Sequence, residues 1–189
     1  ILMPADARDA TRDSAPLNGN PAIGVVDDQS GKVTERLYSS PLGPILQQAI
    51  GRSADEAGLS ASSSTDATYT PGVKNTTEYV LETKIRRCWV KKARGANGQY
   101  GPVLRTVADV AIDVSIYKPP FKVPFWTGST NDTYYDPPVG SFGLGSEDEA
   151  GIYDEPGQVL SVALTRSVAA IFQRQDLRNL MLEDDIKSH

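Results

Sequence analysis

Thiol and imidazole groups are almost absent from this chain of 189 residues, which contains one cysteine, Cys88, and one histidine, His189. A single cysteine excludes an internal disulfide and a cysteine-based zinc cluster, because each needs at least two thiols. The histidine is the last residue, and chain ends are usually mobile, which argues against a histidine triad or a multi-histidine metal site. Cys88 falls on the more polar face of an expected strand with no recognisable activating base, so we interpret it as an inert thiol.

Long apolar runs are also missing, and so is an excess of positive charge. No run of about 18 apolar residues exists, so the sequence predicts no membrane-spanning helix. The formal net charge of -5 opposes a general affinity for nucleic acid or anionic lipid, and any such contact has to be local. The first residues have neither the charged nor the apolar region of a signal peptide, so we expect any targeting segment to lie upstream of Ile1.

Two long stretches in the middle of the chain alternate apolar and polar residues, Thr77 to Arg94 and Pro102 to Lys118. A period of two is typical of strands with one buried and one wet face, and the pair predicts a long antiparallel hairpin. The outer faces of the two strands carry opposite charges. We therefore expect two basic residues to pair across the hairpin with two acidic ones: Lys84 and Arg86 with Asp109 and Asp113.

An amphipathic helix is expected on each side of this hairpin. The first runs from Leu42 to Gly58 with apolar residues spaced by three and four, and Leu59 packs back after the glycine C-cap. The second starts at Pro156 and keeps an apolar stripe to Phe172. Its pattern continues or restarts through three more apolar residues, which extend the core or, less commonly, dock a partner: Leu177, Leu180 and Met181.

The order of these elements predicts one two-layer α+β domain at residues 21–175. A strand is expected at Ala22 to Val26, a short one at Leu59 to Ala61, and the last within Phe121 to Thr130, where Pro124 indicates an edge position. Residues 1–20 are predicted to be a flexible arm or tether, and residues 176–189 a C-terminal helical extension or tail. Residues 131–157 lack a period and are predicted to be a long loop, functional or disordered.

Two sets of charged residues are candidates for binding. Asp27 and Asp28 leave the first strand together, but two carboxylates without a third acid are more often turn formers than metal ligands. Lys91, Lys92 and Arg94 form a basic hairpin tip that invites an anionic ligand. The glycines beside them join two strands, whereas a phosphate cradle leads into a helix N-terminus, so a solvated hairpin end is the favoured interpretation.

Aromatic residues near the long loop are candidates for a partner surface, because aromatic side chains supply much of the anchoring energy at interfaces. They are Trp126, Tyr134, Tyr135 and Phe142. The alternative is that they pack beneath their own loop.

The element order resembles a known family. The strand Ala22 to Val26, the helix Leu42 to Gly58, the strand Glu78 to Glu82, the strand Ala108 to Tyr117, Phe125 to Gly128 and the helix segment Leu160 to Leu164 look like YajG-like lipoproteins and the auxiliary lipoproteins of ABC-type transporters. The resemblance covers residues 22 to 172. It implies two helices on one face of a mixed sheet of about four strands, a periplasmic location with an outer-membrane lipid anchor, and no enzyme activity, catalytic residues, metal or cofactor.

The leading hypothesis is therefore a non-enzymatic accessory lipoprotein of a bacterial envelope complex, for transport or assembly, that contacts envelope protein partners and no nucleic acid. An alternative is a carrier that binds a lipid or glycan between the helices and the sheet, which a continuous apolar cavity would support. Local binding of an anionic ligand at the basic tip is a remote alternative. A metal hydrolase built on Asp27 or Asp28 ranks last, because the ligand count falls short.

Overall fold

A computed structural model describes residues 1–8, 16–28, 30–66, 68–70, 79–98, 101–136 and 155–188, with the backbone alone at 93–98, 101–105 and 183–188. These residues form six strands and three helices, which we label in chain order. They are β1 (Ala5–Asp6), β2 (Ala22–Asp27), β3 (Val33–Tyr38), α1 (Leu42–Glu56), β4 (Val80–Gly98), β5 (Gly101–Tyr117), β6 (Trp126–Asp136), α2 (Pro156–Phe172) and α3 (Gln175–Ser188).

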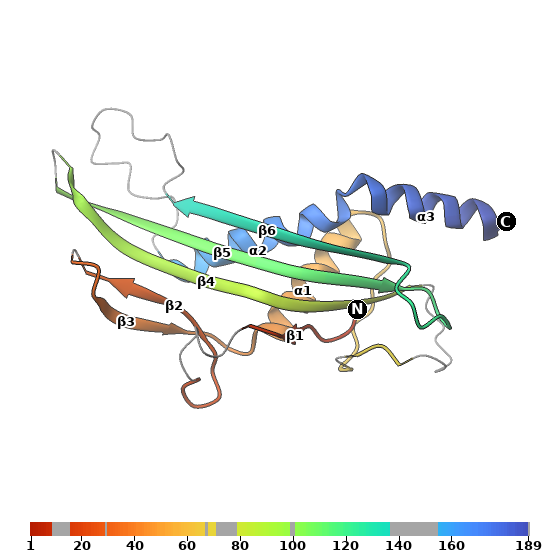
Figure 1. Ribbon diagram of the computed structural model, residues 1–189, viewed down its shortest axis with the longest axis horizontal. Coiled ribbons are helices and arrows are strands. Elements are labelled where there is room, and N and C mark those ends of the chain that lie inside the picture. The colour runs from red at the N-terminus through yellow and green to blue at the C-terminus, as the bar shows by residue number, and fades with distance from the viewer. Residues whose placement is uncertain are drawn as a thin grey trace.

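The strands form one mixed sheet in the order β3-β2-β4-β5-β6, and β1 lies on the same edge of β4 as β2 (Figure 1). β1 and β2 both run parallel to β4, whereas the pairs β2–β3, β4–β5 and β5–β6 are antiparallel. The α+β class, the mixed sheet and the helices packed on it are confirmed. The sheet has six strands where about four were expected, because β1 and β3 give no clear apolar period in the sequence.

The predicted hairpin is confirmed, and its strands extend further toward the turn than expected. β4 and β5 are 19 and 17 residues long, and their pairing continues to Gly98 opposite Gly101. The glycine-rich stretch after Arg94, expected to be a hairpin end, thus belongs largely to the ladder.

A β-bulge in β4 changes which side chains reach the core. The register with β5 shifts between Ile85 and Arg87, so the alternation of the following residues is reversed. Cys88 is consequently buried in the core, 1% exposed, and the prediction that it lies on the polar face was wrong. Trp89, expected on the core side, is half-buried on the opposite face.

The bulge also changes which basic residues form ion pairs on the outer face of the hairpin. Arg86 pairs with Asp113 as expected, with Nε 2.6 Å from Oδ2. Arg87, rather than Lys84 or Arg86, reaches Asp109, with Nε 3.4 Å from Oδ2. These pairs are largely exposed, so each contributes a few tenths of a kcal/mol, on the order of a surface ion pair, and helps to fix the register of the strands.

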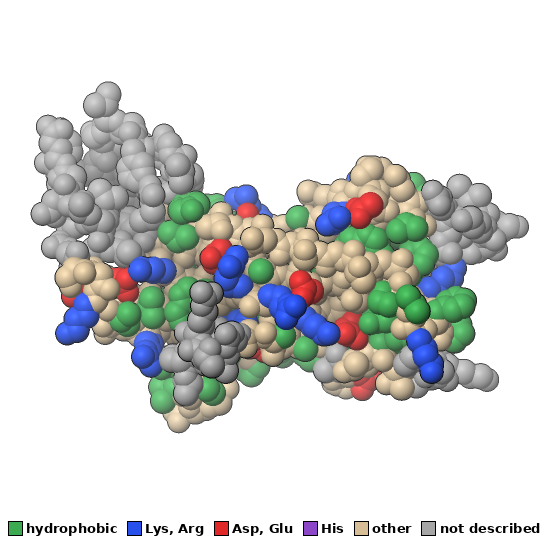
Figure 2. All heavy atoms as spheres, in the orientation of Figure 1, with side chains coloured by type: hydrophobic (Ala, Val, Ile, Leu, Met, Phe, Trp, Pro, Cys, Tyr) green, Lys and Arg blue, Asp and Glu red, His purple; other side chains and the backbone are tan. Residues whose placement is uncertain are grey.

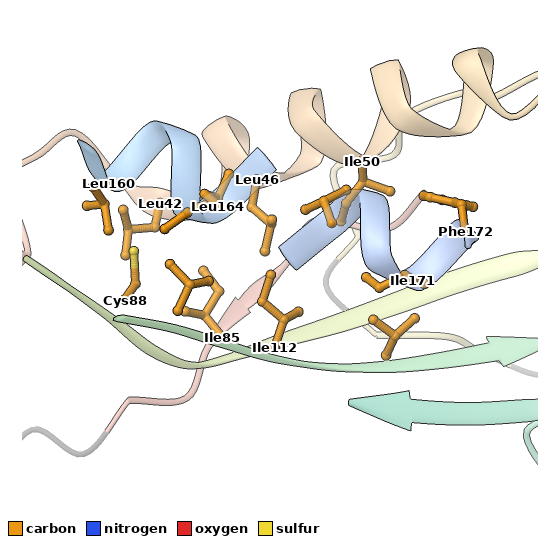
Figure 3. Close-up of a cluster of buried hydrophobic side chains, with 14 of the residues drawn as sticks. Leu42, Leu46, Ile50, Ile85, Cys88, Ile112, Leu160, Leu164, Ile171 and Phe172 are labelled. Carbon is orange, nitrogen blue, oxygen red and sulfur yellow. The ribbon is translucent and has the colours of Figure 1, made fainter. Parts of the chain in front are cut away.

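The core lies between the sheet and the helices α1 and α2 (Figure 3). Leu46 and Ile50 of α1 are fully buried and meet side chains of α2 and of the central strands. The largest fully buried residues of the sheet and of α2 in this layer are Ile85, Val90, Val110, Ile112, Val114, Val159, Val168 and Ile171.

α1 ends as the sequence predicts. Gly58 has a φ of 82°, a left-handed conformation that glycine adopts without steric cost. Its N–H donates to the carbonyl of Asp55 at 3.0 Å, and the N–H of Leu59 donates to the carbonyl of Ala54 at 2.9 Å. Leu59 packs against the core, which completes a Schellman cap. The short strand expected at residues 59–61 is not part of the sheet.

The last strand lies further along the chain than expected. β6 begins at Trp126 and runs to Asp136, so residues 131–136, expected to open a long loop, belong to the sheet. One face of an antiparallel sheet can be solvated, and exposed residues of β6 accordingly alternate with half-buried ones. Residues 155–157, at the other end of the predicted loop, are the N-cap and first residues of α2, and residues 137–154 lie outside the described residues.

Both ends of the described chain pack against the domain. Residues 1–8, expected to be a tether or extended arm, include β1 and place Leu2 in a buried position. At the other end, Leu177 of α3 is 1% exposed, and Leu180 and Met181 pack at the edge of the core. The core-extension interpretation of these three residues is confirmed.

The close contact between β2 and β4 gives a stability prediction. A Cβ atom at Gly24 would collide with the carbonyl oxygen and side chain of Val90, so Gly24→Ala requires the two strands to separate. We expect the free energy of unfolding to fall by about 1–3 kcal/mol, as for an overpacked core site. Gly157→Ala is the matched control, because nothing lies within 4 Å of a Cβ there. Denaturant unfolding measures both, and equal values would contradict the packing at Gly24.

Candidate ligand-binding cleft

A cleft of about 860 Å³ opens at the end of the sheet opposite to the β4–β5 turn. Four segments meet there: residues 1–2, the end of α1 with residues 59–70, the start of β4 beside the end of β5, and the junction of α2 with α3. Apolar side chains from these segments line one part of the cleft: Ile1, Leu2, Ala54, Leu59, Tyr79, Val80, Leu81, Ile116, Phe172, Leu177 and Met181.

Hydroxyl groups line another part of the cleft. They come mostly from the segment after α1, in which Ser60, Ser62, Ser63, Ser64, Thr68, Tyr69 and Thr70 face it. An apolar surface beside a group of hydroxyls is suited to an amphipathic molecule, because the apolar part is removed from water while a polar head keeps its hydrogen bonds.

Tyr69 carries a hydroxyl group in the cleft wall whose hydrogen-bonding capacity is not used by the other described residues. Its ring stacks on Tyr117, with centroids 4.6 Å apart, and the residue is 8% exposed. Its buried hydroxyl has no hydrogen-bond partner in the described part of the chain. Since a buried hydroxyl without a partner is costly, this atom is a candidate donor to a bound ligand.

The carboxylate of Glu82 interacts with both tyrosines of this stacked pair. One of its carboxylate oxygens accepts the backbone N–H of Tyr69 at 3.2 Å, and the other lies 3.8 Å from Nζ of Lys84. Burial first, and the charge of Glu82 second, raise the pKa of Tyr117 above its usual value. The phenol of Tyr117 therefore stays neutral at physiological pH.

The wall of the cleft is held by hydrogen bonds that cross long stretches of sequence. Gln47 of α1 is 8% exposed, and its amide nitrogen donates to the carbonyls of Ile1 at 3.0 Å and Ser64 at 2.7 Å. The backbone of Ser64 donates back to the Ile1 carbonyl at 2.8 Å. These bonds join α1, the N-terminal segment and the hydroxyl-bearing segment into one rigid wall.

The aromatic residues proposed for a partner surface do not form one surface. Trp126 is 6% exposed, and its indole N–H donates to Asp176 at 3.1 Å. Tyr134 is half-buried beneath Arg166, and Tyr135 is 37% exposed. Both tyrosines lie in β6 rather than in a loop, and Phe142 lies outside the described residues. Trp126 is therefore largely buried by packing in this structure, and a partner surface formed by these aromatic residues stays a prediction.

The contact of Trp126 involves a charged pair on the surface of α3. Arg174 donates to both carboxylate oxygens of Asp176 at 3.0 Å and lies over the Trp126 ring, 5.4 Å from its centroid. The hydrogen bonds from Arg174 first, and from Trp126 second, hold the pKa of Asp176 well below its usual range. This pair fixes the start of α3 against β6.

The two aspartates singled out in the sequence have structural contacts in the described part of the chain. Asp28 is a turn former, as expected, since its Oδ1 accepts the N–H groups of Ser30 and Lys32. Asp27 is 4% exposed, and its Oδ2 lies 2.6 Å from Nζ of Lys91. No three His, Cys, Asp or Glu side chains gather at a metal-binding distance within the described ranges.

The basic tip is only partly a free cationic surface. Lys91 is compensated by Asp27, Lys92 is half-buried, and the side chain of Arg94 lies outside the described residues. The ion pair between Asp27 and Lys91 joins β2 to β4, so both candidate residues have a structural role.

Comparison with known proteins adds the following. No family model matches the sequence, and no curated protein matches it. A crystal structure of protein XCC0632 from Xanthomonas campestris, described as family DUF330, is similar over 100% of this chain and 88% of that one. The sequence identity is 12% and the TM-score is 0.46. The chain is thus similar in structure to a DUF330 protein, and its membership of a family remains a prediction. No helix among the described residues is long and apolar enough to cross a membrane.

Tyr69→Phe tests whether the hydroxyl is unpaired. Removing a buried hydroxyl without a partner is expected to raise the free energy of unfolding of the unliganded protein by about 1 kcal/mol. Tyr38→Phe on β3, outside the cleft, is the control and should change little. Thermal and denaturant unfolding measure both variants. A loss of stability at Tyr69 would mean that its hydroxyl is already bonded.

Proposed function

We propose that this protein binds an amphipathic molecule in the cleft, without catalysing a reaction on it, and serves as an accessory protein of a bacterial envelope complex. The observation that supports binding is the cleft itself, with its apolar lining beside the buried Tyr69 hydroxyl. The envelope setting, with a periplasmic location and an outer-membrane anchor, is proposed from the resemblance of the sequence alone.

The size and lining of the cleft favour a molecule with an apolar chain and a hydrogen-bond acceptor at its head. A volume of about 860 Å³ lies within the range of about 300–1,000 Å³ that is usual for small-molecule sites. Among the described residues that line it there is no Lys or Arg side chain, and Asp66 contributes a carboxylate. A neutral or hydroxyl-bearing head is therefore the chemistry that the cleft fits best, with the apolar chain against Leu81, Ile116 and Phe172.

The absence of catalysis is proposed from the same lining. A serine acts as a nucleophile when a base such as histidine or lysine activates it. No such residue lines the cleft in the described part of the chain. The Ser64 hydroxyl instead donates to the carboxylate of Asp66 at 3.2 Å. Cys88 is the other nucleophile of interest, but it is buried in the core, away from the cleft lining.

Contact with a protein partner is a second candidate function, favoured by β6. This strand of 11 residues is the last of the sheet and pairs with β5 alone among the described strands. A groove of about 480 Å³ runs between it and α2, lined by four consecutive β6 residues and by six residues of α2 and the turn after it. An extended segment of a partner fits such an edge, because it continues the backbone hydrogen bonds of the sheet.

Ser63→Trp tests the binding of a ligand in the cleft. Ser63 is exposed and lines the cleft, so an indole there occupies part of its volume. We expect the affinity for a dansyl-labelled fatty alcohol, measured by fluorescence titration, to fall by about tenfold or more, as for a blocked apolar site. Ser161→Trp, at an exposed serine of α2 outside the cleft, is the matched control. Equal affinities, or no binding by the parent protein, would reject the proposal.

The protein-contact function is tested by photo-cross-linking in the native envelope. A photoreactive residue at Asn131, on the edge strand β6, is expected to give one discrete adduct that the same residue at Thr34 of β3 does not give. A synthetic peptide from the captured region should then compete for the adduct. Adducts of equal pattern at both positions would argue against a partner site at β6.

A further inference from the structure

The connection between β5 and β6 exposes two large apolar side chains that are separated in sequence by one lysine. Phe121 is 63% exposed and Val123 is 74% exposed, the largest values among the exposed large hydrophobic residues of the described chain. Lys118 and Lys122 stand beside them, and Phe125 completes the group. Single exposed hydrophobic residues are common, but a pair on a protruding connection flanked by lysines marks a contact surface.

We propose that this connection, residues 118–125, docks on an anionic lipid surface, with Phe121 and Val123 in the acyl-headgroup boundary and the lysines among the headgroups. Aromatic and aliphatic side chains at the boundary are removed from water, while lysines nearby meet the negative charge of the lipid. The long stem of a lysine also lets its ammonium group reach the headgroups while its methylenes lie beside apolar atoms.

The base of the connection is fixed, so that its tip is presented rather than collapsed on the sheet. The N–H of Phe121 donates to the carbonyl of Lys118 at 3.0 Å, and the N–H of Phe125 donates to the carbonyl of Ile116 at 2.7 Å. The ring of Phe125 lies against Tyr79, with centroids 5.5 Å apart. A preorganised tip loses less conformational entropy when it inserts.

The local charge of the connection is complementary to an anionic lipid surface. The net charge of -5 repels an anionic surface at long range, so binding requires a local cationic group. Lys118 and Lys122 provide one beside the apolar tip, and residues 118–125 contain no acidic side chain. Figure 2 shows hydrophobic side chains beside blue Lys or Arg atoms at the end of the molecule where Figure 1 places this connection.

The position of the connection links the lipid surface to the cleft. Phe125 contacts Tyr79, and Tyr79 and Ile116 line the cleft. Docking through Phe121 and Val123 therefore brings the cleft end of the protein to the membrane. The docking itself does not depend on a ligand in the cleft, so the two proposals fail independently.

Vesicle co-sedimentation tests the docking. The full chain is expected to sediment with vesicles of phosphatidylethanolamine and phosphatidylglycerol, and less with phosphatidylcholine alone. The double variant Phe121→Asp, Val123→Asp should reduce the bound fraction several-fold. The double variant Lys118→Gln, Lys122→Gln should bind without a preference for phosphatidylglycerol. Its bound fraction should also no longer fall as the salt concentration rises. Leu182→Asp is the matched control, because Leu182 of α3 is 62% exposed and lies outside the connection.

Insertion is measured directly with Phe121→Trp. Its emission is expected to shift to the blue with phosphatidylglycerol vesicles, whereas Leu182→Trp should show no shift. Circular dichroism and the melting temperature verify that each variant is folded. Failure of the parent chain to bind either vesicle at low salt would overturn the proposal, and so would equal losses in the loop variant and in Leu182→Asp. If the connection contacts only a protein partner, the parent chain will bind neither kind of vesicle.

Discussion

The burial of one face of the β4–β5 hairpin beneath α1 and α2 is the constraint on which the rest of the structure depends. Val90 and Val110 on this face are fully buried against α2 residues such as Val159 and Val168. Loss of one large side chain from such a layer lowers the free energy of unfolding by about 2–5 kcal/mol. The whole free energy of unfolding of a domain is about 5–15 kcal/mol. The helices and the hairpin therefore stabilise one another.

The features that the sequence predicts well are those encoded by neighbouring residues. The hairpin follows from local alternation, and the end of α1 follows from Gly58 and Leu59. The side of Cys88 was not predictable in this way, because one bulge reverses the alternation after Ile85. β3 was missed because its residues are mostly exposed, so that its position is set by pairing with β2 rather than by an apolar period.

The cleft was not predictable for a related reason. Its lining comes from four segments that are separated in the sequence and meet only when α1 and α3 pack at the end of the sheet. The hydroxyl-rich stretch after Gly58 was the one visible signal, and alone it is typical of an ordinary loop. By contrast, the apolar pattern of the second helix and its extension does predict where Phe172 and Leu177 are buried, although not that they line a cleft.

The cleft lies at the end of the hairpin where other segments of the chain cover the start of β4. At the start of β4, Leu2 and Tyr69 pack on Val80 and form a second small cluster beside the main core. The segments that cover this end carry backbone carbonyls that need hydrogen-bond donors, and Gln47 donates to two of them. A ligand that enters the cleft must leave these bonds intact, because they hold its wall. The hydroxyl of Tyr69 has no such role among the described contacts, so Tyr69, rather than Gln47, is the residue to which the proposed binding function assigns polar recognition.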